Sequence, residues 1–283
     1  MSVLFTSTLT PQHGHMNLAH LNRNTEPRTV LWVSAHPEPG SLTTSLGQSG
    51  IHALREQGHE VITSDLYAMD WDPVVRRDNL DRRGVTDRVE VTKTGRTAYL
   101  AGALTEDVAA EQGKVRCADA FVVQFPLWWY GMPAILKGWF DRVFVSGFAF
   151  GTDPVTGRRL RFEQGPFRGV PALAVVTAGD RPRAFGPRGI SGPPDELFYG
   201  LLHGTFAYTG MSALQPWILP SADFTTEESF RAAEESLSAR LTGIFEEEPI
   251  GYREQFTGDY TGDWDLHPHV APGRTGLSAH RCA

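Results

Sequence analysis

The chain contains 283 residues, of which 41% are hydrophobic and 21% are charged. These proportions are typical of a globular protein with a full hydrophobic core. The formal net charge is −7 at pH 7, which argues against nucleic acid as a partner, since proteins that bind the phosphate backbone are usually basic. No apolar run approaches the roughly 18 residues of a membrane-spanning helix, so we expect no membrane insertion.

The two cysteines, Cys117 and Cys282, show neither metal-ligand spacing nor a disulfide framework. Two free thiols indicate a reducing, cytoplasmic setting. Residues 1–27 are polar and lack the apolar core of a secretion signal, so we interpret them as a flexible N-terminal extension. Three residues of this extension are the histidines His13, His15 and His20. A solvated tail explains them better than a metal site, and we expect no metal ion.

Strand and helix patterns alternate along the chain. A run rich in β-formers at 29–34 predicts a buried strand, 43–57 a helix and 60–64 a second strand. This order predicts a right-handed crossover between parallel strands. Residues 65–105 are polar and irregular, and a connection of that length is often functional. The later elements alternate in the same way: helix 106–118, strand 120–125, helix 133–144, strand 171–177, helix 195–208, strand 213–219 and helix 226–245.

Five strands alternating with helices predict an α/β domain, with a doubly wound five-stranded parallel sheet and helices on both faces. The dinucleotide fingerprint G-x-G-x-x-G is absent after the first strand, which favours the flavodoxin-like strand order 2-1-3-4-5 over the Rossmann order. We assign residues 28–250 to this domain. Residues 251–283 are rich in Gly, Pro, His and Asp, and we expect an extended C-terminal tail that is able to wrap a partner subunit.

Ligands of open α/β sheets bind beyond the carboxyl ends of the strands, near the switch in strand order. The loop after the first strand brings His36, Ser41, Leu42 and Thr43 to the N-terminus of a helix. Free N–H groups and the helix dipole attract a phosphate there, and the side chains of His36, Ser41 and Thr43 can add hydrogen bonds. A simple N-cap role for Ser41 or Thr43 explains these residues about equally well.

The loops after the third and fourth strands are also unusual. Three adjacent aromatic residues, Trp128, Trp129 and Tyr130, follow the third strand, and their rings can cover the face of a planar cofactor. A hydrophobic plug beneath the long loop is the alternative. The small residues of 177–180 let the backbone approach a ligand closely, and their N–H groups can bond the edge of an isoalloxazine ring. An ordinary loop is the alternative there.

Several other kinds of active site are missing from the sequence. It contains no Ser-His-Asp order, G-x-S-x-G elbow, P-loop or H-E-x-x-H motif. The three loops together suit a planar, phosphorylated cofactor, and a flavin is the natural candidate. A flavin carries its own hydride chemistry, so the protein need only position it and tune its electronics.

Two stretches carry a family resemblance: SDLYAM at 64–69 and QFPLWWYGMPAILKGWFDRVF at 124–144. The sequence GPF at 165–167 and the strand ending at Thr177 also fit, as does the tail sequence APGRTGL at 271–277. Over residues 30–249 the chain resembles the flavodoxin-like NAD(P)H:quinone oxidoreductases of the DT-diaphorase type and their bacterial relatives. This resemblance implies a ping-pong reaction, in which NADPH or NADH passes hydride to the flavin and a quinone-like acceptor then takes up two electrons in the same pocket.

The resemblance also implies a non-covalently bound FAD at a homodimer interface. FMN is less favoured, because residues 65–105 leave material to hold an adenosine half. The diphosphate-binding loop matches His36, Ser41, Leu42 and Thr43. The flavin-contacting loop matches Pro126, Leu127, Trp128, Trp129 and Tyr130, and the loop along the flavin edge matches Thr177, Ala178 and Gly179. Phe185 joins the cofactor-binding residues, and the expected catalytic residues are Trp129, Tyr130, Gly179 and Asp180.

The chain departs from this family at several positions. A Tyr and a His that stabilise charge on the reduced flavin correspond to Phe185 and Ser191, neither of which can relay a proton in that way. Two pocket tyrosines from the partner subunit correspond to Phe150 and Thr152, and Asp180 stands where the family has Gly. The neighbouring arginines, Arg181 and Arg183, are candidates for offsetting charge at the flavin edge.

Three other functions remain open at this stage. One is an electron carrier similar to a flavodoxin, although flavodoxins are usually shorter. Another is a tailoring enzyme whose changed pocket serves a polyketide, nitro, azo or indole-type substrate. The third is a regulator that merely retains flavin, which the intact set of convergent loops disfavours.

Overall fold

The structure is a computed structural model that describes residues 26–84 and 88–282. Nearly all of the predicted N-terminal extension, including its three histidines, lies outside the described residues. None of the described helices is long and apolar enough to cross a membrane.

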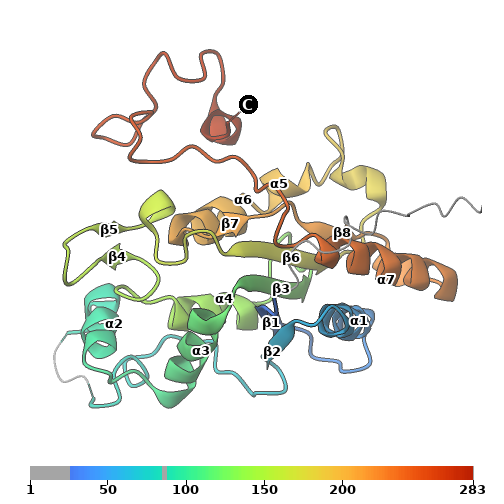
Figure 1. Cartoon of the computed structure of the whole chain (residues 1–283), viewed down its shortest axis with the longest axis horizontal. Helices are drawn as coiled ribbons and strands as arrows, with labels where there is room; N and C mark the ends of the chain where they lie inside the picture. The colour runs from blue at the N-terminus through green and yellow to red at the C-terminus, as the bar shows by residue number, and fades with distance from the viewer. Residues whose placement is uncertain (1–25, 85–87, 283) are drawn as a thin grey trace, which may run out of the picture.

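One parallel sheet forms the centre of the molecule (Figure 1). Its strands are β1 (Thr29–Ser34), β2 (Glu60–Asp65), β3 (Ala120–Pro126), β6 (Pro171–Thr177), β7 (Ser212–Ala213) and β8 (Trp217–Leu219). The order is β2-β1-β3-β6-β7, with β8 also paired to β6. Every residue of β3 is buried, as expected of a central strand covered on both faces. The doubly wound sheet and its predicted strand order are confirmed.

The predicted strand at 213–219 is wrong as a single element. The chain pairs with β6 at β7, where the Leu214 N–H still donates to the Ala172 carbonyl, leaves the sheet over residues 215–216, and pairs with β6 again at β8. Pro216 lies in this gap, where a proline has no N–H to offer the strand ladder. The fifth position of the sheet is therefore filled by two short strands.

Helices cover both faces of the sheet, as predicted. On one face, α1 (Leu42–Glu56) packs against α7 (Glu227–Thr242) over a buried cluster that includes Trp32. On the other face, α3 (Glu106–Cys117) and α4 (Ala134–Val143) contact each other over a larger, aromatic-rich cluster. Both faces of the strands are thus buried in apolar cores.

The sequence interpretation missed one helix and did not foresee the irregularity of another. Residues 65–105 contain a helix, α2 (Val91–Leu100), which its polar composition concealed. The predicted helix at 195–208 is confirmed as helical but is irregular, since it is divided into α5 (Pro194–Leu197), α6 (Tyr199–Leu201), the π-helical turn η4 (Leu202–Phe206) and the 3-10 turn η5 (Ala207–Thr209). Gly200 and Gly204 fall within this stretch, and glycine weakens a regular helix.

The segment beyond residue 250 folds back on its own chain. The Glu163 carboxylate, in the turn η2 (Phe162–Gln164), accepts hydrogen bonds from the backbone N–H groups of Gln255 and Phe256. The Arg161 guanidinium lies 4.3 Å from the ring centre of Trp264. The last turn of the C-terminal segment is η7 (Gly276–His280), and Arg281 after it forms an ion pair with Asp195. These contacts fix the segment beside α5 and a small hairpin of β4 (Gly151–Thr152) and β5 (Arg159–Leu160).

Candidate functional site

The N-terminus of α1 is formed by the loop after β1. Ser41 is the N-cap, since its Oγ accepts a hydrogen bond of 3.1 Å from the Thr44 N–H. The first intrahelical hydrogen bond is donated by Ser45 to the Ser41 carbonyl. The N–H groups of Leu42 and Thr43 donate to none of the described residues, as expected for the first turn of a helix. The two explanations for this loop are therefore compatible: Ser41 caps the helix, and the N–H groups of Leu42 and Thr43 still have no partner among the described residues, as an anion site requires.

A buried hydroxyl pair ties this helix end to the fourth parallel strand. The Oγ1 atoms of Thr43 and Thr177 lie 2.6 Å apart, and both residues are buried. The backbone carbonyl of Thr43 also accepts a hydrogen bond of 2.5 Å, from Nε2 of Gln124 on β3. Contacts from three elements thus hold the loops after β1, β3 and β6 together.

The aromatic residues after β3 form a tight turn. Trp128 and Gly131 exchange two backbone hydrogen bonds of 3.0 Å. The two residues between them, Trp129 and Tyr130, have φ angles of 49° and 57°. Positive φ at both central positions is the pattern of a type I′ turn, which normally selects Gly or Asn. Bulky residues are unfavourable there, and such strain is often found at functional sites.

This turn holds its rings in solvent. Trp129 is 100% exposed, Tyr130 53% and Trp128 43%, so the predicted alternative of a hydrophobic plug is wrong. The ring centres of Trp128 and His36 are 6.5 Å apart, which brings the first and third loops together. The Leu127 N–H donates to the Thr177 carbonyl at 2.8 Å, so the turn leaves the sheet directly beside the loop after β6.

The loop after β6 is fixed mainly through its backbone. The Ala178 N–H donates to the Leu219 carbonyl at 2.9 Å, and the Asp180 carbonyl accepts from the Ser221 N–H at 2.8 Å. Gly179 is exposed, and the nearest atom to a Cβ added there is a carboxylate oxygen of Asp223 at 3.0 Å. The backbone at Gly179 is therefore open to a ligand.

Phe185 and Ser191 lie in the segment that follows this loop. Phe185 ends the 3-10 turn η3 (Pro182–Phe185) and is half-buried. Within the described residues, its side chain makes no ring contact or hydrogen bond with the three loops. Ser191 is buried and donates from its Oγ to Oδ2 of Asp180 at 2.7 Å, a contact that sequence reasoning missed.

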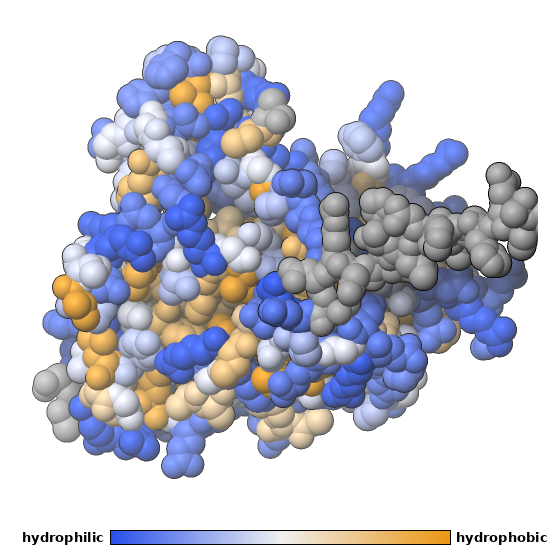
Figure 2. All heavy atoms as spheres, in the orientation of Figure 1, coloured by the Kyte–Doolittle hydropathy of each residue, from blue (hydrophilic) through white to orange (hydrophobic). Residues whose placement is uncertain are grey.

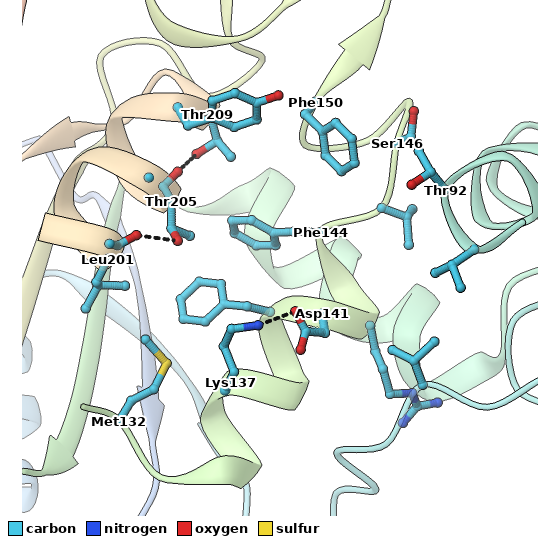
Figure 3. A pocket seen from close by; sticks show the side chains of 18 of the residues that line it. Thr92, Met132, Lys137, Asp141, Phe144, Ser146, Phe150, Leu201, Thr205 and Thr209 are labelled. Atoms are coloured by element: carbon cyan, nitrogen blue, oxygen red, sulfur yellow. Dashed lines mark hydrogen bonds and ion pairs between the residues drawn. The ribbon is translucent and has the colours of Figure 1, made fainter. Parts of the chain in front are cut away.

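A cavity of about 690 Å³ opens beside the aromatic turn, between α2, α4 and the turns α5 to η5. Figure 2 shows apolar side chains gathered in a hollow over these elements, with hydrophilic residues around it. Figure 3 shows Phe144 and Phe150 facing Leu201, Thr205 and Thr209 across the opening. Polar side chains, including those of Asn79, Ser146 and Tyr208, are interspersed in its mainly apolar lining. Lys137 and Asp141 on α4 form an ion pair of 2.5 Å at its edge.

Sequence reasoning selected two residues of this cavity, Tyr130 and Phe150. The other walls come from segments far apart in the chain, and no local pattern marks such a juxtaposition. The volume lies within the range of small-molecule sites, which are mostly apolar with a few polar groups.

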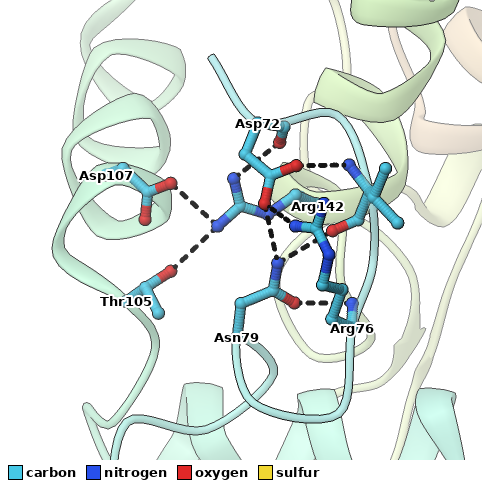
Figure 4. Close-up of polar contacts among 7 residues, drawn as sticks. Asp72, Arg76, Asn79, Thr105, Asp107 and Arg142 are labelled. Carbon is cyan, nitrogen blue, oxygen red and sulfur yellow. Dashed lines mark hydrogen bonds and ion pairs between the residues drawn. The ribbon is translucent and has the colours of Figure 1, made fainter. Parts of the chain in front are cut away.

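A buried arginine holds one wall of the cavity in place (Figure 4). Arg142, on α4, donates to the carbonyl of Asp72 at 2.8 Å and pairs with the Asp107 carboxylate at 2.8 Å. Its guanidinium also lies 4.7 Å from the ring centre of Trp71. Burial raises the pKa of Asp107, but the Thr105 hydroxyl, the Val108 N–H and Arg142 outweigh it and hold that pKa below its usual value. The loop after β2, which supplies Asn79 and Leu80 to the cavity, is therefore fastened to α3 and α4.

The comparison with known families agrees with this architecture. A family model described as the flavodoxin-like fold matches residues 28–241. The chain belongs to the flavodoxin-like family. The match takes in β1 to α7, and therefore all three loops of the site, whereas the C-terminal segment of this flavodoxin-like chain lies beyond it.

Similar proteins include oxidoreductases. The ribosyldihydronicotinamide dehydrogenase-like protein traD of Penicillium crustosum is 38% identical over 234 residues, covering 82% of this chain and 86% of that protein. The NAD(P)H dehydrogenase (quinone) 1 of Rattus norvegicus is 32% identical over 224 residues, covering 79% and 80%. The crystal structure of a candidate quinone reductase from Klebsiella pneumoniae is 38% identical, with a TM-score of 0.84, and covers 90% of this flavodoxin-like chain and 100% of its own.

Proposed function

We propose that this protein is a flavin-dependent NAD(P)H:quinone oxidoreductase. One observation carries the proposal: the loops after β1, β3 and β6 meet at one edge of the sheet and adjoin an apolar cavity of about 690 Å³. The named relatives, a ribosyldihydronicotinamide dehydrogenase-like protein and an NAD(P)H dehydrogenase (quinone), support the same reaction class.

The residues at this edge fit a bound flavin. The N–H groups of Leu42 and Thr43 suit a phosphate, with the dipole of α1 behind them. His36 and Ser41 border this position, and Pro126 and Leu127 lead into the aromatic turn. The exposed backbone of Gly179 suits the polar edge of a planar ring, and the buried residues Thr177 and Ala178 hold it in place through their backbone hydrogen bonds. When bound, the flavin supplies the hydride chemistry.

The protein's own contribution is to hold the reacting partners in contact and to keep water away from them. The exposed rings of Trp129 and Tyr130 form a wall against which a nicotinamide or a quinone can stack. Gly179 and Asp180 belong to the loop after β6, from which they would hold the edge of the reacting ring system. Since donor and acceptor need the same wall, they bind in turn, which gives ping-pong kinetics.

We propose FAD as the cofactor, with a homodimer as the working form. The cavity beside Tyr130 is open to solvent, and Phe150 and Phe144 are part of its lining. A second copy of the chain would close this apolar surface, and Thr152 would lie near the same boundary. The described part of the loop after β2, residues 66–84, is fastened by Arg142 and provides surface to hold an adenosine half. We assign residues 28–250 to the flavin-binding domain and 251–283 to a C-terminal tail, in a cytoplasmic protein.

One observation favours a specialised acceptor as a second candidate. Phe150, which lines the cavity, brings a ring without a hydroxyl group to a position where the resemblance implies a tyrosine. Hydrogen bonds to a quinone oxygen would then come from other lining side chains, such as Tyr130 and Tyr208, and larger aromatic acceptors, including nitro or azo compounds, fit the mainly apolar cavity. A short electron carrier has no need of such a cavity.

The test begins with the visible spectrum of the purified protein, followed by anaerobic addition of a donor and then menadione. NADH, NADPH and dihydronicotinamide riboside are compared as donors, and the released flavin is identified as FAD or FMN. We expect bleaching by a donor and rapid recovery with menadione. A protein that binds neither flavin would overturn the proposal. Bleaching that only nitro or azo compounds reverse would select the specialised acceptor.

A further inference from the structure

The loop after β6 holds a carboxylate at a fixed position beside the open backbone of Gly179. Oδ2 of Asp180 accepts the hydrogen bond from Ser191 at 2.7 Å. Its backbone carbonyl accepts another, from Ser221, so the residue is anchored at both ends. Ser191 is itself buried, and its N–H donates to the Ala184 carbonyl at 3.0 Å. The whole loop between Asp180 and Ser191 is thereby closed on itself.

This anchoring separates Asp180 from the other charged groups nearby. Arg181 and Arg183 are exposed, so solvent and salt screen their charge. Asp223 is exposed too, although one of its oxygens lies close to Gly179. Asp180 is half-buried and is held in place by a buried partner. Of these four groups, its charge therefore acts with the most constant direction on a ligand at Gly179.

We propose that Asp180, positioned by Ser191, lowers the reduction potential of the bound flavin. This inference rests on the proposed function, since it requires a flavin at Gly179. A hydride carries two electrons and one proton, so its transfer from the nicotinamide adds one negative charge to the acceptor ring system. A fixed carboxylate beside that ring disfavours the added charge, because like charges repel more strongly in a partly buried site. The reduced cofactor is then a stronger reductant, suited to aromatic acceptors of low potential.

Ser191 is a positioning residue in this scheme, because it acts only through Asp180. Its hydroxyl fixes one rotamer of the carboxylate. Without that bond, the charge spreads over several rotamers and its average effect on the ring falls. Ser191→Thr retains the hydroxyl and should preserve the effect.

The test measures the two-electron midpoint potential of the bound flavin against a reference dye, for the wild type, five single variants and one double variant. Asp180→Asn keeps the shape and an acceptor for Ser191 but removes the charge. We expect it to shift the reduction equilibrium at least tenfold toward the reduced form, or about 30 mV upward. Asp180→Glu restores the charge and should lie closer to the wild type. Glu235→Gln removes one exposed carboxylate from the middle of α7 and serves as the matched control, with no shift.

Ser191→Ala completes the experiment, alone and combined with Asp180→Asn. Alone, Ser191→Ala should shift the reduction equilibrium about threefold toward the reduced form, and so raise the midpoint potential. In the combined variant it should add nothing, since a residue that acts only through its neighbour has no effect once that neighbour is neutral. An Asp180→Asn potential equal to that of Glu235→Gln would overturn the inference. The inference would also be overturned if Ser191→Ala shifted the potential as much in the Asp180→Asn variant as it does in the wild type.

The two proposals fail in different ways. Flavin binding is followed separately, from the visible spectrum and from the dissociation constant of each variant. A wild-type protein that binds no flavin overturns the proposed function, and this inference with it. Flavin that binds normally at an unchanged potential overturns only the role of Asp180.

Discussion

Two groups of aromatic residues lie close together in the sequence and serve opposite purposes. Trp128, Trp129 and Tyr130 form the exposed turn after β3. Trp139 and Phe140 lie in the helix α4 and are buried. Phe121 on β3 stacks on Trp139 at 5.9 Å, and Trp139 also meets the ring of Phe140 edge-on at 5.2 Å. The two groups have the same side-chain chemistry, so their difference arises from the backbone that presents them.

The backbone explains why one group supports folding and the other supports binding. The helix α4 directs its rings into the core, where Nε1 of Trp139 finds a partner in the Glu111 carboxylate at 2.8 Å. The turn instead places Trp129 and Tyr130 in a left-handed conformation that exposes them. An exposed ring on a strained backbone contributes little to stability. This contrast supports a ligand-binding role for the turn.

The largest expected effect comes from truncating the buried group. Trp139→Ala should lower the free energy of unfolding by about 3–5 kcal/mol, through the cavity it leaves and the donor that Glu111 loses. Glu111 would keep the Ser64 hydroxyl and Lys114 as partners. Urea unfolding measures the effect, with Trp129→Ala as the matched control at less than about 0.5 kcal/mol. Similar losses for both tryptophans would show that the turn packs as core.

The second expected effect concerns the contact that joins the exposed site to the core. Thr177→Val removes one partner of the buried hydroxyl pair and leaves the Thr43 hydroxyl unsatisfied. We expect a loss of about 1–3 kcal/mol in urea unfolding, together with weaker flavin binding. The double change of Thr43 and Thr177 to Val should cost less than Thr177→Val alone, because no buried donor then lacks a partner. A double variant that is clearly less stable than the single one would argue against this account.

The sequence predicted the sheet well because strands leave a strong local pattern. The run at 120–125 is almost wholly apolar, and the structure buries all of β3. The three loops were also found, since the carboxyl ends of parallel strands meet at one edge. Local patterns failed where the structure depends on distant partners. The cavity, the Arg142 network and the bond from Ser191 to Asp180 each join segments that no local pattern relates. Pro216 was visible in the sequence, but the two-strand solution around it was not.

The third expected effect separates strain from function within the turn. Trp129→Gly removes the steric cost of a left-handed conformation, which stabilises the folded state by about 1 kcal/mol. The greater freedom of glycine in the unfolded chain largely cancels this gain. We expect the free energy of unfolding to stay within about 0.5 kcal/mol of the wild type. The kcat/KM for menadione should fall at least tenfold, which corresponds to about 1.4 kcal/mol of transition-state stabilisation. Trp129→Phe retains a ring and should recover part of the rate. Unchanged kinetics in Trp129→Gly would remove this residue from the proposed acceptor wall.

The smallest expected effect concerns a third aromatic group, which lies between α6 and the C-terminal segment. It tests whether these rings are held by packing, as in the core, or are exposed, as in the turn after β3. His203 stacks on Tyr199 at 4.6 Å and meets Tyr252 edge-on at 4.8 Å. Burial, with a smaller contribution from the charge of His280, lowers the pKa of His203 to about 4. In the unfolded chain the pKa is near 6.5, so between about pH 4 and 6.5 the unfolded state binds more protons. Stability therefore rises with pH through this window and is level above it.

From pH 7.5 to pH 5, we expect His203 to account for a loss of about 1 kcal/mol in the free energy of unfolding, after allowance for partial solvent access to its ring. His203→Phe preserves the stacking but cannot titrate, so its pH dependence should be shallower by that amount while carboxylates contribute equally to both proteins. If stability depended equally on pH in the wild type and in His203→Phe, His203 would accept a proton in the folded state without disturbing its packing. The C-terminal segment would then resemble the exposed turn after β3, in which rings are held by the backbone and not by the packing around them.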